Sequence, residues 1–153
     1  MITIIHGGHR DGLCYNAAET FKRLLLESGT PVNLFNLRNH NFAFCCGDQL
    51  CQDSGACVYN DSITREIIPT IARSEALVFF TPTYFNMPPA ILKSFLDRCN
   101  LLLTIEDRKH PRFGAWVSGQ TESDSLEQCY QCLATFAEIC ELDSLTGGRI
   151  SRF

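Results

Sequence analysis

The 153-residue sequence has no apolar run long enough to cross a bilayer, and it lacks the charged and then apolar start of a secretory signal. We therefore expect a cytoplasmic protein with no membrane partner. It also has no cluster of basic residues, and its formal net charge is −4, so the electrostatic footprint of a nucleic-acid-binding protein is missing. Composition is otherwise ordinary for a globular protein, and the length favours one domain over residues 1–153.

Cysteine, in contrast, is abundant, with nine residues in the chain. In a reducing compartment such residues serve as packing, metal-binding or redox-active groups more often than as disulfides. Four of them lie in "CCGDQLCQDSGAC" (45–57), but the C-x2-C spacing typical of a zinc site is absent there. Two more lie in "CYQC" (129–132), where Cys129 shares a helical face with Leu133, Phe136 and Cys140, which predicts core packing.

Short β-rich runs alternate with amphipathic segments along the chain. Strands are predicted at 2–6, 31–37, 76–81 and 113–119, with a weaker fifth at 144–151, and helices at 16–28, 62–74, 88–103 and 125–140. Gly29 is a stop signal for the first helix, and Pro69 should kink or shorten the second. This alternation predicts a doubly wound α/β fold, in which helices cover both faces of a parallel sheet.

Sheets of this kind bind ligands beyond the carboxyl ends of their strands. The loop after the first strand reads "HGGHRDGLCYN" (6–16), and its glycines let the backbone approach a ligand closely. The following helix would direct its free N–H groups into this space, where Arg10 could hold a phosphate. An ordinary glycine-rich turn with a solvent-facing Arg10 explains the loop equally well.

The loop after the third strand reads "TPTYFNMPP" (81–89) and places two aromatic residues, Tyr84 and Phe85, between prolines. Large rings in an exposed loop suggest a flat apolar ligand. The alternative is that both rings fold back onto the core. The loop after the fourth strand, "SGQTESD" (118–124), fits a surface turn as well as it fits a ligand contact.

Together these loops resemble the NAD(P)H-dependent FMN reductase branch of the flavodoxin-like superfamily, which includes the iron–sulfur flavoproteins. The resemblance covers about residues 2–120. In the first loop it includes Gly7, Arg10 and Gly12. In the second it includes Pro82, Tyr84, Phe85, Pro88, Leu92, Lys93, Phe95, Leu96, Asp97 and Arg98.

The resemblance implies a flavodoxin-like fold with five parallel strands in the order 2-1-3-4-5 and three αβα layers. It also implies FMN as cofactor and NAD(P)H as co-substrate, with a quinone, a flavin or a metal as the small electron acceptor. The FMN phosphate would lie on the amides of residues 9–16. The flavin ring would lie on residues 82–86. The implied cofactor-binding residues are His9, Arg10, Cys14, Tyr15, Asn16, Pro82, Thr83, Tyr84, Phe85, Asn86, Gly119 and Gln120.

Two features depart from the family pattern. The hydroxyls of the family's phosphate loop are absent between residues 7 and 16, and only Tyr15 or Asn16 could replace them. Each hydrogen bond lost to a charged group costs about 1.5–3 kcal/mol. The chain also stops where the fifth strand would end, without a closing helix, so a partly bare sheet face favours a homodimer or a higher homo-oligomer.

The cysteine segment leaves three functions open. In the iron–sulfur branch the comparable segment looks like C-x2-C-x2-C, and the middle position falls here on Asp48, a poor ligand for a soft cluster. We therefore expect a flavin-only oxidoreductase with no metal site. The alternatives are an iron–sulfur flavoprotein electron carrier and a non-catalytic redox sensor with a flavodoxin-like fold.

Overall fold

A parallel sheet of five strands forms the centre of the molecule. The computed structural model describes residues 1–119 and 123–144 of the chain. Across the sheet the strands follow the order β2 (Val32–Asn36), β1 (Ile2–His6), β3 (Ala76–Pro82), β4 (Arg112–Ser118) and β5 (Asp143–Ser144), and each neighbouring pair is parallel. The predicted α/β fold and the order of its strands are therefore confirmed. β5 has two residues, and the rest of the predicted fifth strand, 145–151, lies outside the described residues.

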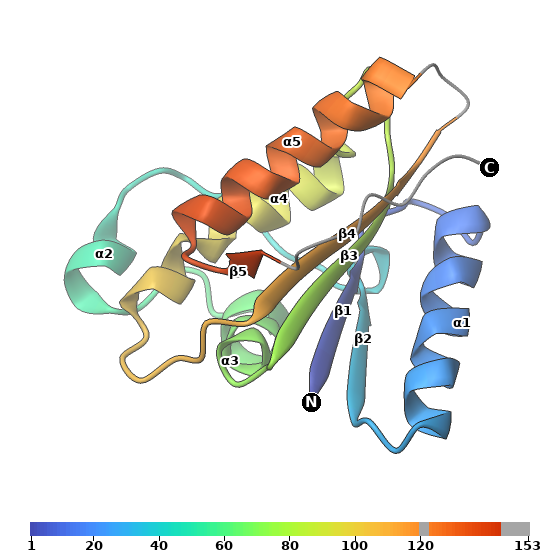
Figure 1. Ribbon diagram of the computed structural model, residues 1–153. Coiled ribbons are helices and arrows are strands. Elements are labelled where there is room, and N and C mark those ends of the chain that lie inside the picture. Colours follow the sequence, from blue (N-terminus) through green and yellow to red (C-terminus); the bar gives the residue numbers. More distant parts are fainter. Residues whose placement is uncertain (120–122, 145–153) are drawn as a thin grey trace.

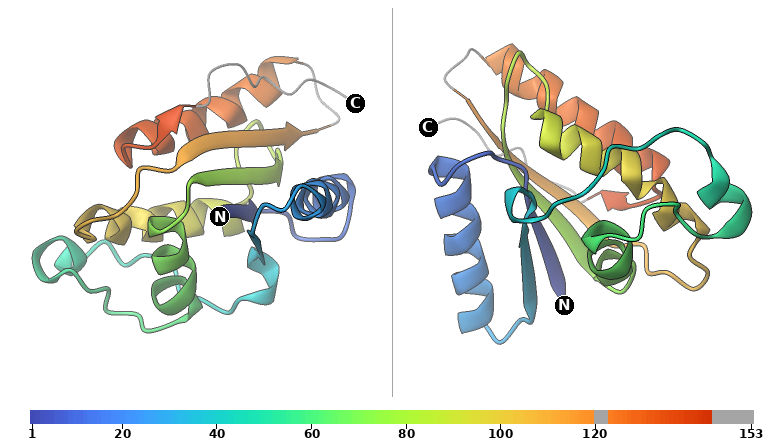
Figure 2. Two further views of the ribbon diagram at one scale, coloured as in Figure 1. Left: turned by 60° about the horizontal axis from the view of Figure 1, so that its bottom comes forward. Right: turned by 180° about the vertical axis from the view of Figure 1, so that it is seen from behind.

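Helices lie on both faces of this sheet and give the molecule three layers (Figure 1). α1 (Leu13–Glu27) covers one face, whereas α3 (Ile68–Ala72), α4 (Ala90–Arg98) and α5 (Ser123–Ile139) lie on the other. The short α2 (Leu50–Ser54) lies at the outer edge of the second group, away from the sheet (Figure 2). None of the helices in residues 1–119 and 123–144 is long and apolar enough to span a bilayer.

α1 begins earlier than predicted and ends where expected. Its first residue is Leu13 rather than Asn16, because the chain turns into the helix directly at Gly12. At the other end Gly29 has a φ of +82°, and the N–H of Thr30 donates to the carbonyl of Leu25 (2.9 Å). This arrangement closes the helix through a left-handed glycine, which confirms the predicted stop signal.

Proline divides the predicted helix 62–74. Ile63–Ile67 form a π-helical turn, and α3 follows with Pro69 in its first turn. Because proline has no N–H, it cannot bond the carbonyl four residues earlier, and the wider turn lets the chain continue without that bond. The predicted helix 88–103 is likewise observed as α4 followed by a 3-10 turn, Cys99–Thr104.

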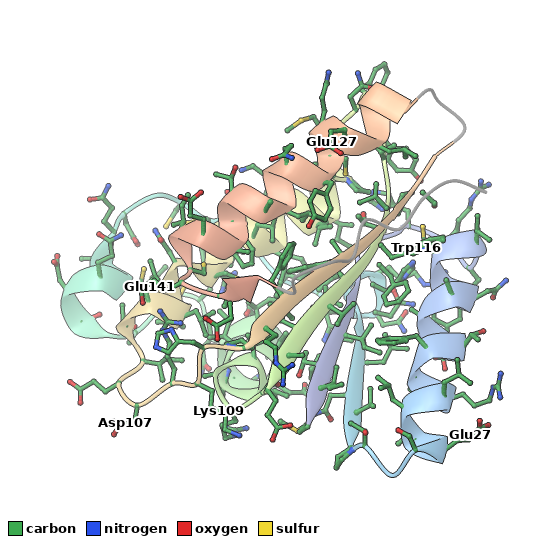
Figure 3. The ribbon with its side chains drawn as sticks, viewed as in Figure 1. Glu27, Asp107, Lys109, Trp116, Glu127 and Glu141 are labelled. Atoms are coloured by element: carbon green, nitrogen blue, oxygen red, sulfur yellow. The ribbon has the colours of Figure 1, made fainter. Side chains whose placement is uncertain are left out.

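The sheet separates two hydrophobic cores. The larger one lies between the sheet and the α3, α4 and α5 layer, and it contains the fully buried Phe79 and Phe95. The smaller one lies under α1, where Trp116 of β4 points toward the helix (Figure 3) and packs against Phe80. Cys129 and Cys140 are buried in the larger core, and burial raises the pKa of each thiol to about 11. Their predicted role as packing residues is confirmed.

A buried ion pair attaches the cysteine segment to α4. The Arg98 guanidinium donates to both carboxylate oxygens of Asp61, at 2.9 and 3.2 Å, and to the carbonyl of Ala43 at 2.8 Å. It also lies over the Tyr59 ring, 4.9 Å from the ring centroid. Asp61 accepts two further hydrogen bonds from backbone N–H groups at the start of the π-helical turn. Arg98 therefore fixes both ends of a long segment, 43–61, that contains little regular structure of its own.

Candidate functional site

A cavity of about 630 Å³ lies beyond the carboxyl ends of β1, β3 and β4. Its volume is within the range of small-molecule and cofactor sites, about 300–1,000 Å³. The cavity lies where doubly wound sheets bind ligands, and three loops converge on it. Its lining residues are His6, Gly8, His9, Arg10, Gly12, Leu13, Cys14, Pro82, Thr83, Tyr84, Phe85, Ser118 and Gly119.

The structure brings most of the predicted site residues together around this cavity. Those that line it are His9, Arg10, Cys14, Pro82, Thr83, Tyr84, Phe85 and Gly119. Tyr15, Asn16 and Asn86 are not among the lining residues, and Gln120 lies outside the described residues. Tyr15 is turned along α1, where its hydroxyl donates to Glu19 at 3.1 Å. Tyr15 and Asn16 therefore do not line the cavity, and their role in place of the missing hydroxyls stays a prediction.

The glycine-rich loop forms one wall of the cavity and leads into α1. Gly12 is the residue before the helix and offers no side-chain cap, and the first helical turn contains no acidic residue. The N–H of Asn16 donates to the carbonyl of Gly12 (2.9 Å), so its amide is used within the helix, contrary to the sequence expectation. The N–H groups of residues 13–15 remain at the positive end of the helix dipole, where an anion is favoured.

Two earlier glycines are needed for packing rather than for access to the cavity. A Cβ at Gly7 would lie 2.7 Å from Cδ2 of the buried Leu92, and one at Gly8 would lie 2.7 Å from Nε2 of His6. A Cβ at Gly12 would meet no atom of residues 1–119 and 123–144 within 4 Å. Gly12 is therefore the position of this loop where space is left for a ligand.

Cys14 and Ser118 connect this wall to the end of β4. The Cys14 thiol lies 2.8 Å from the Ser118 hydroxyl and is buried in the smaller core. Burial raises the pKa of this thiol, opposed by its hydrogen bond to Ser118, so Cys14 stays protonated at neutral pH. Ser118 was missed in the sequence, although it is the last residue of a strand at the ligand-binding edge.

The opposite wall is a tight turn that carries the aromatic residues. Tyr84 and Met87 exchange two backbone hydrogen bonds of 3.0 Å, and the residues between them, Phe85 and Asn86, have φ values of +49° and +65°. The Tyr84 amide is thus used by the turn, and only those of Phe85 and Asn86 remain for a ligand. The Phe85 side chain is fully exposed and Tyr84 is 44% exposed. Neither ring folds back onto the core.

Phe85 at a positive φ indicates local strain, because the left-handed region costs a bulky residue roughly 1–2 kcal/mol. We expect Phe85→Gly to leave the free energy of unfolding unchanged or to raise it by about 1 kcal/mol. As a contrast, Phe79→Ala at a fully buried position should lower the free energy of unfolding by about 3–5 kcal/mol. Urea denaturation of both variants tests this, and a clear loss of stability in Phe85→Gly would show that the ring supports the fold.

His6 is the functional candidate that sequence reasoning passed over. It is the last residue of β1, is fully buried, and lines the cavity. The sequence motifs assigned His6 no role in the site. A histidine that ends an otherwise apolar buried strand, directly before two glycines, was the available signal.

Taken together, the cavity fits a ligand with an anionic group at one end and a flat ring at the other. The anionic end would meet the start of α1 and Arg10, and the ring would meet the turn that carries Tyr84. His9 already lies over Tyr84, with ring centroids 6.1 Å apart and an interplanar angle of 7°, so this wall stacks planar groups. The His6 ring, which lies beneath Gly8, also lines the cavity at this end.

Comparison with known proteins identifies the family. The family model described as NADPH-dependent FMN reductase matches residues 1–142. The chain belongs to this family. Within residues 1–119 and 123–144 of this FMN reductase family member, no group of three or more His, Cys, Asp or Glu residues is arranged to hold a metal ion.

The chain is also similar to a curated protein and to solved structures. An iron–sulfur flavoprotein of Clostridioides difficile (strain 630) is 27% identical over 106 residues, which are 67% of this chain and 47% of that protein. The chain thus spans about half the length of this curated relative.

The NAD(P)H:(acceptor) oxidoreductase FerB from Paracoccus denitrificans has a TM-score of 0.67 at 15% identity, over 95% of this chain and 74% of FerB. An NAD(P)H:quinone oxidoreductase from Methanothermobacter marburgensis has a TM-score of 0.67 at 19% identity, over 95% and 80% of the two chains. These structures share the fold.

Proposed function

We propose that this FMN reductase family member binds FMN and passes electrons from NAD(P)H to a small acceptor such as a quinone, a free flavin or a metal ion. The observation that carries the proposal is a single cavity between the uncapped start of α1 and the exposed aromatic turn. The family assignment supports it, because FMN has a phosphate at one end and a flat ring at the other.

In this proposal the protein binds and orients the cofactor, and bound FMN supplies the electron-transfer chemistry. The amides of residues 13–15 and the exposed Arg10 would hold the phosphate. Pro82 and Thr83, at the end of β3, would support the ring edge, while Tyr84 and Phe85 would cover part of its surface. Because Phe85 is fully exposed, the outer side of the site is open to a second planar molecule.

The most direct test is the visible spectrum of protein purified without oxygen and then reconstituted with FMN. Retained flavin with two resolved bands, together with NAD(P)H oxidation on addition of a quinone, supports the proposal. A colourless protein that neither binds FMN nor oxidises NAD(P)H overturns it. Steady turnover with a quinone also excludes the redox-sensor alternative.

Arg10→Ala should weaken FMN binding about tenfold or more, because hydrogen bonds to a charged group contribute about 1.5–3 kcal/mol each. Riboflavin, which lacks the phosphate, should bind this variant and the native protein equally well. Arg23→Ala is the matched control, since Arg23 pairs with Glu27 at the far end of α1. Quenching of flavin fluorescence measures the affinities of the native protein and of both variants for FMN and for riboflavin. Equal loss for FMN and riboflavin would remove Arg10 from the phosphate site.

A second candidate, an iron–sulfur flavoprotein electron carrier, is favoured by the curated relative of that name and by the four cysteines of segment 45–57. Cys45 and Cys46 are exposed, whereas Cys51 and Cys57 are partly buried and pack against the larger core. Iron and acid-labile sulfide in protein purified without oxygen decide between the two. About four of each per chain would establish the cluster. Zero iron would leave the flavin-only function.

The homodimeric or higher homo-oligomeric assembly stays a prediction. Sedimentation equilibrium tests the assembly: a mass of one chain at micromolar concentration would contradict the dimer.

A further inference from the structure

His6 occupies the floor of the glycine-rich loop, between β1 and α1. A Cβ on Gly8 would lie 2.7 Å from His6 Nε2 and 3.0 Å from its Cε1, so the ring lies directly beneath the Gly8 backbone. On its other side the ring meets Tyr15 edge-on, with centroids 5.4 Å apart. The imidazole therefore lies under the loop on which the phosphate of the proposed flavin site would rest.

The two ring nitrogens of His6 have unlike surroundings. Nδ1 lies 3.0 Å from Oδ1 of Asn36, which is buried at the end of β2. Because an amide oxygen only accepts hydrogen bonds, Nδ1 carries the proton of the neutral ring, and Nε2 presents a lone pair. Nε2 is buried and has no hydrogen-bond partner within residues 1–119 and 123–144.

A purely structural role does not explain this arrangement. Leaving a buried polar atom without a partner costs about 1–3 kcal/mol, and an apolar residue at position 6 would avoid that cost. The lone pair lies directly beneath the Gly8 backbone of the loop on which the phosphate would rest. A phosphate dianion repels a lone pair but is attracted by an N–H and a positive charge, so its binding favours a protonated Nε2.

The ionisable groups near His6 do not prevent protonation of its Nε2. Burial lowers the pKa of His6, the hydrogen bond to Asn36 opposes this effect, Arg38 lowers the pKa further and Asp11 raises it. Arg38 and Asp11 form a salt bridge with each other, so their effects on His6 largely cancel. The remaining ionisable groups nearby are Tyr15 on α1 and the exposed His9 and Arg10 of the same loop. None of them holds His6 in its protonated form before an anion arrives.

We propose that His6 is a positioning residue of the phosphate site, and that it takes up one proton from solvent at Nε2 when a phosphate dianion occupies the loop. This inference rests on the proposed flavin site and adds a dependence on pH to it. FMN affinity then rises as pH falls from 8.5 to 6.5, by at most about tenfold per pH unit for one linked proton. Riboflavin affinity does not change over this range.

The direct measurement is the NMR titration of the His6 Cε1–H resonance in the native protein, first alone, then with FMN, then with inorganic phosphate. We expect FMN and inorganic phosphate each to raise the pH of the His6 transition by about one unit or more. Fluorescence titration of His6→Gln should then show FMN binding that is independent of pH. His110→Gln, which alters a half-exposed histidine beyond the opposite end of β4, should keep the native dependence.

The outcomes separate this inference from the flavin proposal. If FMN binds but the His6 transition does not move, the role of His6 is wrong and the flavin site stands. If inorganic phosphate moves the transition but FMN does not bind, the role of His6 stands and the flavin assignment falls. If neither ligand moves it, the inference is overturned. These measurements use the native protein, so they decide the question even if His6→Gln fails to fold.

Discussion

Gly12→Val is expected to weaken FMN binding at least about 100-fold while riboflavin binds as before. The residue stands immediately before α1, and the branched side chain would fill the space in which the phosphate would meet the amides of residues 13–15. Loss of two hydrogen bonds to a charged group removes about 3–6 kcal/mol of binding free energy, which corresponds to a factor of roughly 100 or more.

This effect should occur without damage to the fold. A Cβ at Gly12 meets no atom within 4 Å in the part of the chain that the structure describes, and the backbone there is extended, with a φ of −161°, which any residue adopts. Gly7→Val provides the contrast, because its side chain would collide with Leu92 in the larger core and should lower stability by about 1–3 kcal/mol or more. Fluorescence titration with FMN and with riboflavin, combined with urea denaturation, separates the two cases. Equal losses for both flavins in Gly12→Val would place the phosphate elsewhere.

Arg98→Met should lower the free energy of unfolding by about 3–5 kcal/mol. This is the largest stability effect that we expect from the substitution of one buried polar residue. The guanidinium is 1% exposed, and its removal leaves the mostly buried Asp61 carboxylate without its partner. Segment 43–61 would also lose the hydrogen bond at Ala43. Lys93→Met on the same helix is the matched control: Lys93 pairs with Asp97 in solvent, and its loss should cost no more than about 0.5 kcal/mol.

The Arg98–Asp61 pair also makes the free energy of unfolding depend on pH. Burial raises the pKa of Asp61, but the hydrogen bonds and charge of Arg98, together with two backbone N–H groups, lower it further, so the net shift is downward. A lowered carboxylate pKa contributes stability that is complete above the unfolded value near 3.9 and is lost as pH falls through the folded value. Urea denaturation between pH 6 and pH 3 should therefore show a smaller acid loss in Arg98→Met than in the native protein. Equal stability of Arg98→Met and Lys93→Met would contradict the importance of the buried pair.

Most of the sheet and the position of the site were predictable from local pattern. β1 and β3 consist mainly of apolar residues, and such short apolar runs are typical of buried parallel strands. The same holds for the stop of α1 at Gly29, since only its immediate neighbours determine it. The effect of Pro69 on the second helix was also predictable, because it depends on the missing N–H of that residue, whereas α2 was not predicted inside the cysteine segment.

By itself, the sequence determined the fold class, the three loops of the site and the resemblance to the FMN reductase family. Those properties depend on periodicity and on short motifs, which are local in the chain. Only the tertiary structure decided which side chains face the cavity. It turned Tyr15 toward Glu19, brought Ser118 beside Cys14 across 104 positions, and buried His6 with Nδ1 bonded to Asn36 and Nε2 without a partner among the described residues. The physical reason is that hydrogen-bond partners and burial are set by residues far apart in the chain, which the packing of α1 on the sheet brings together.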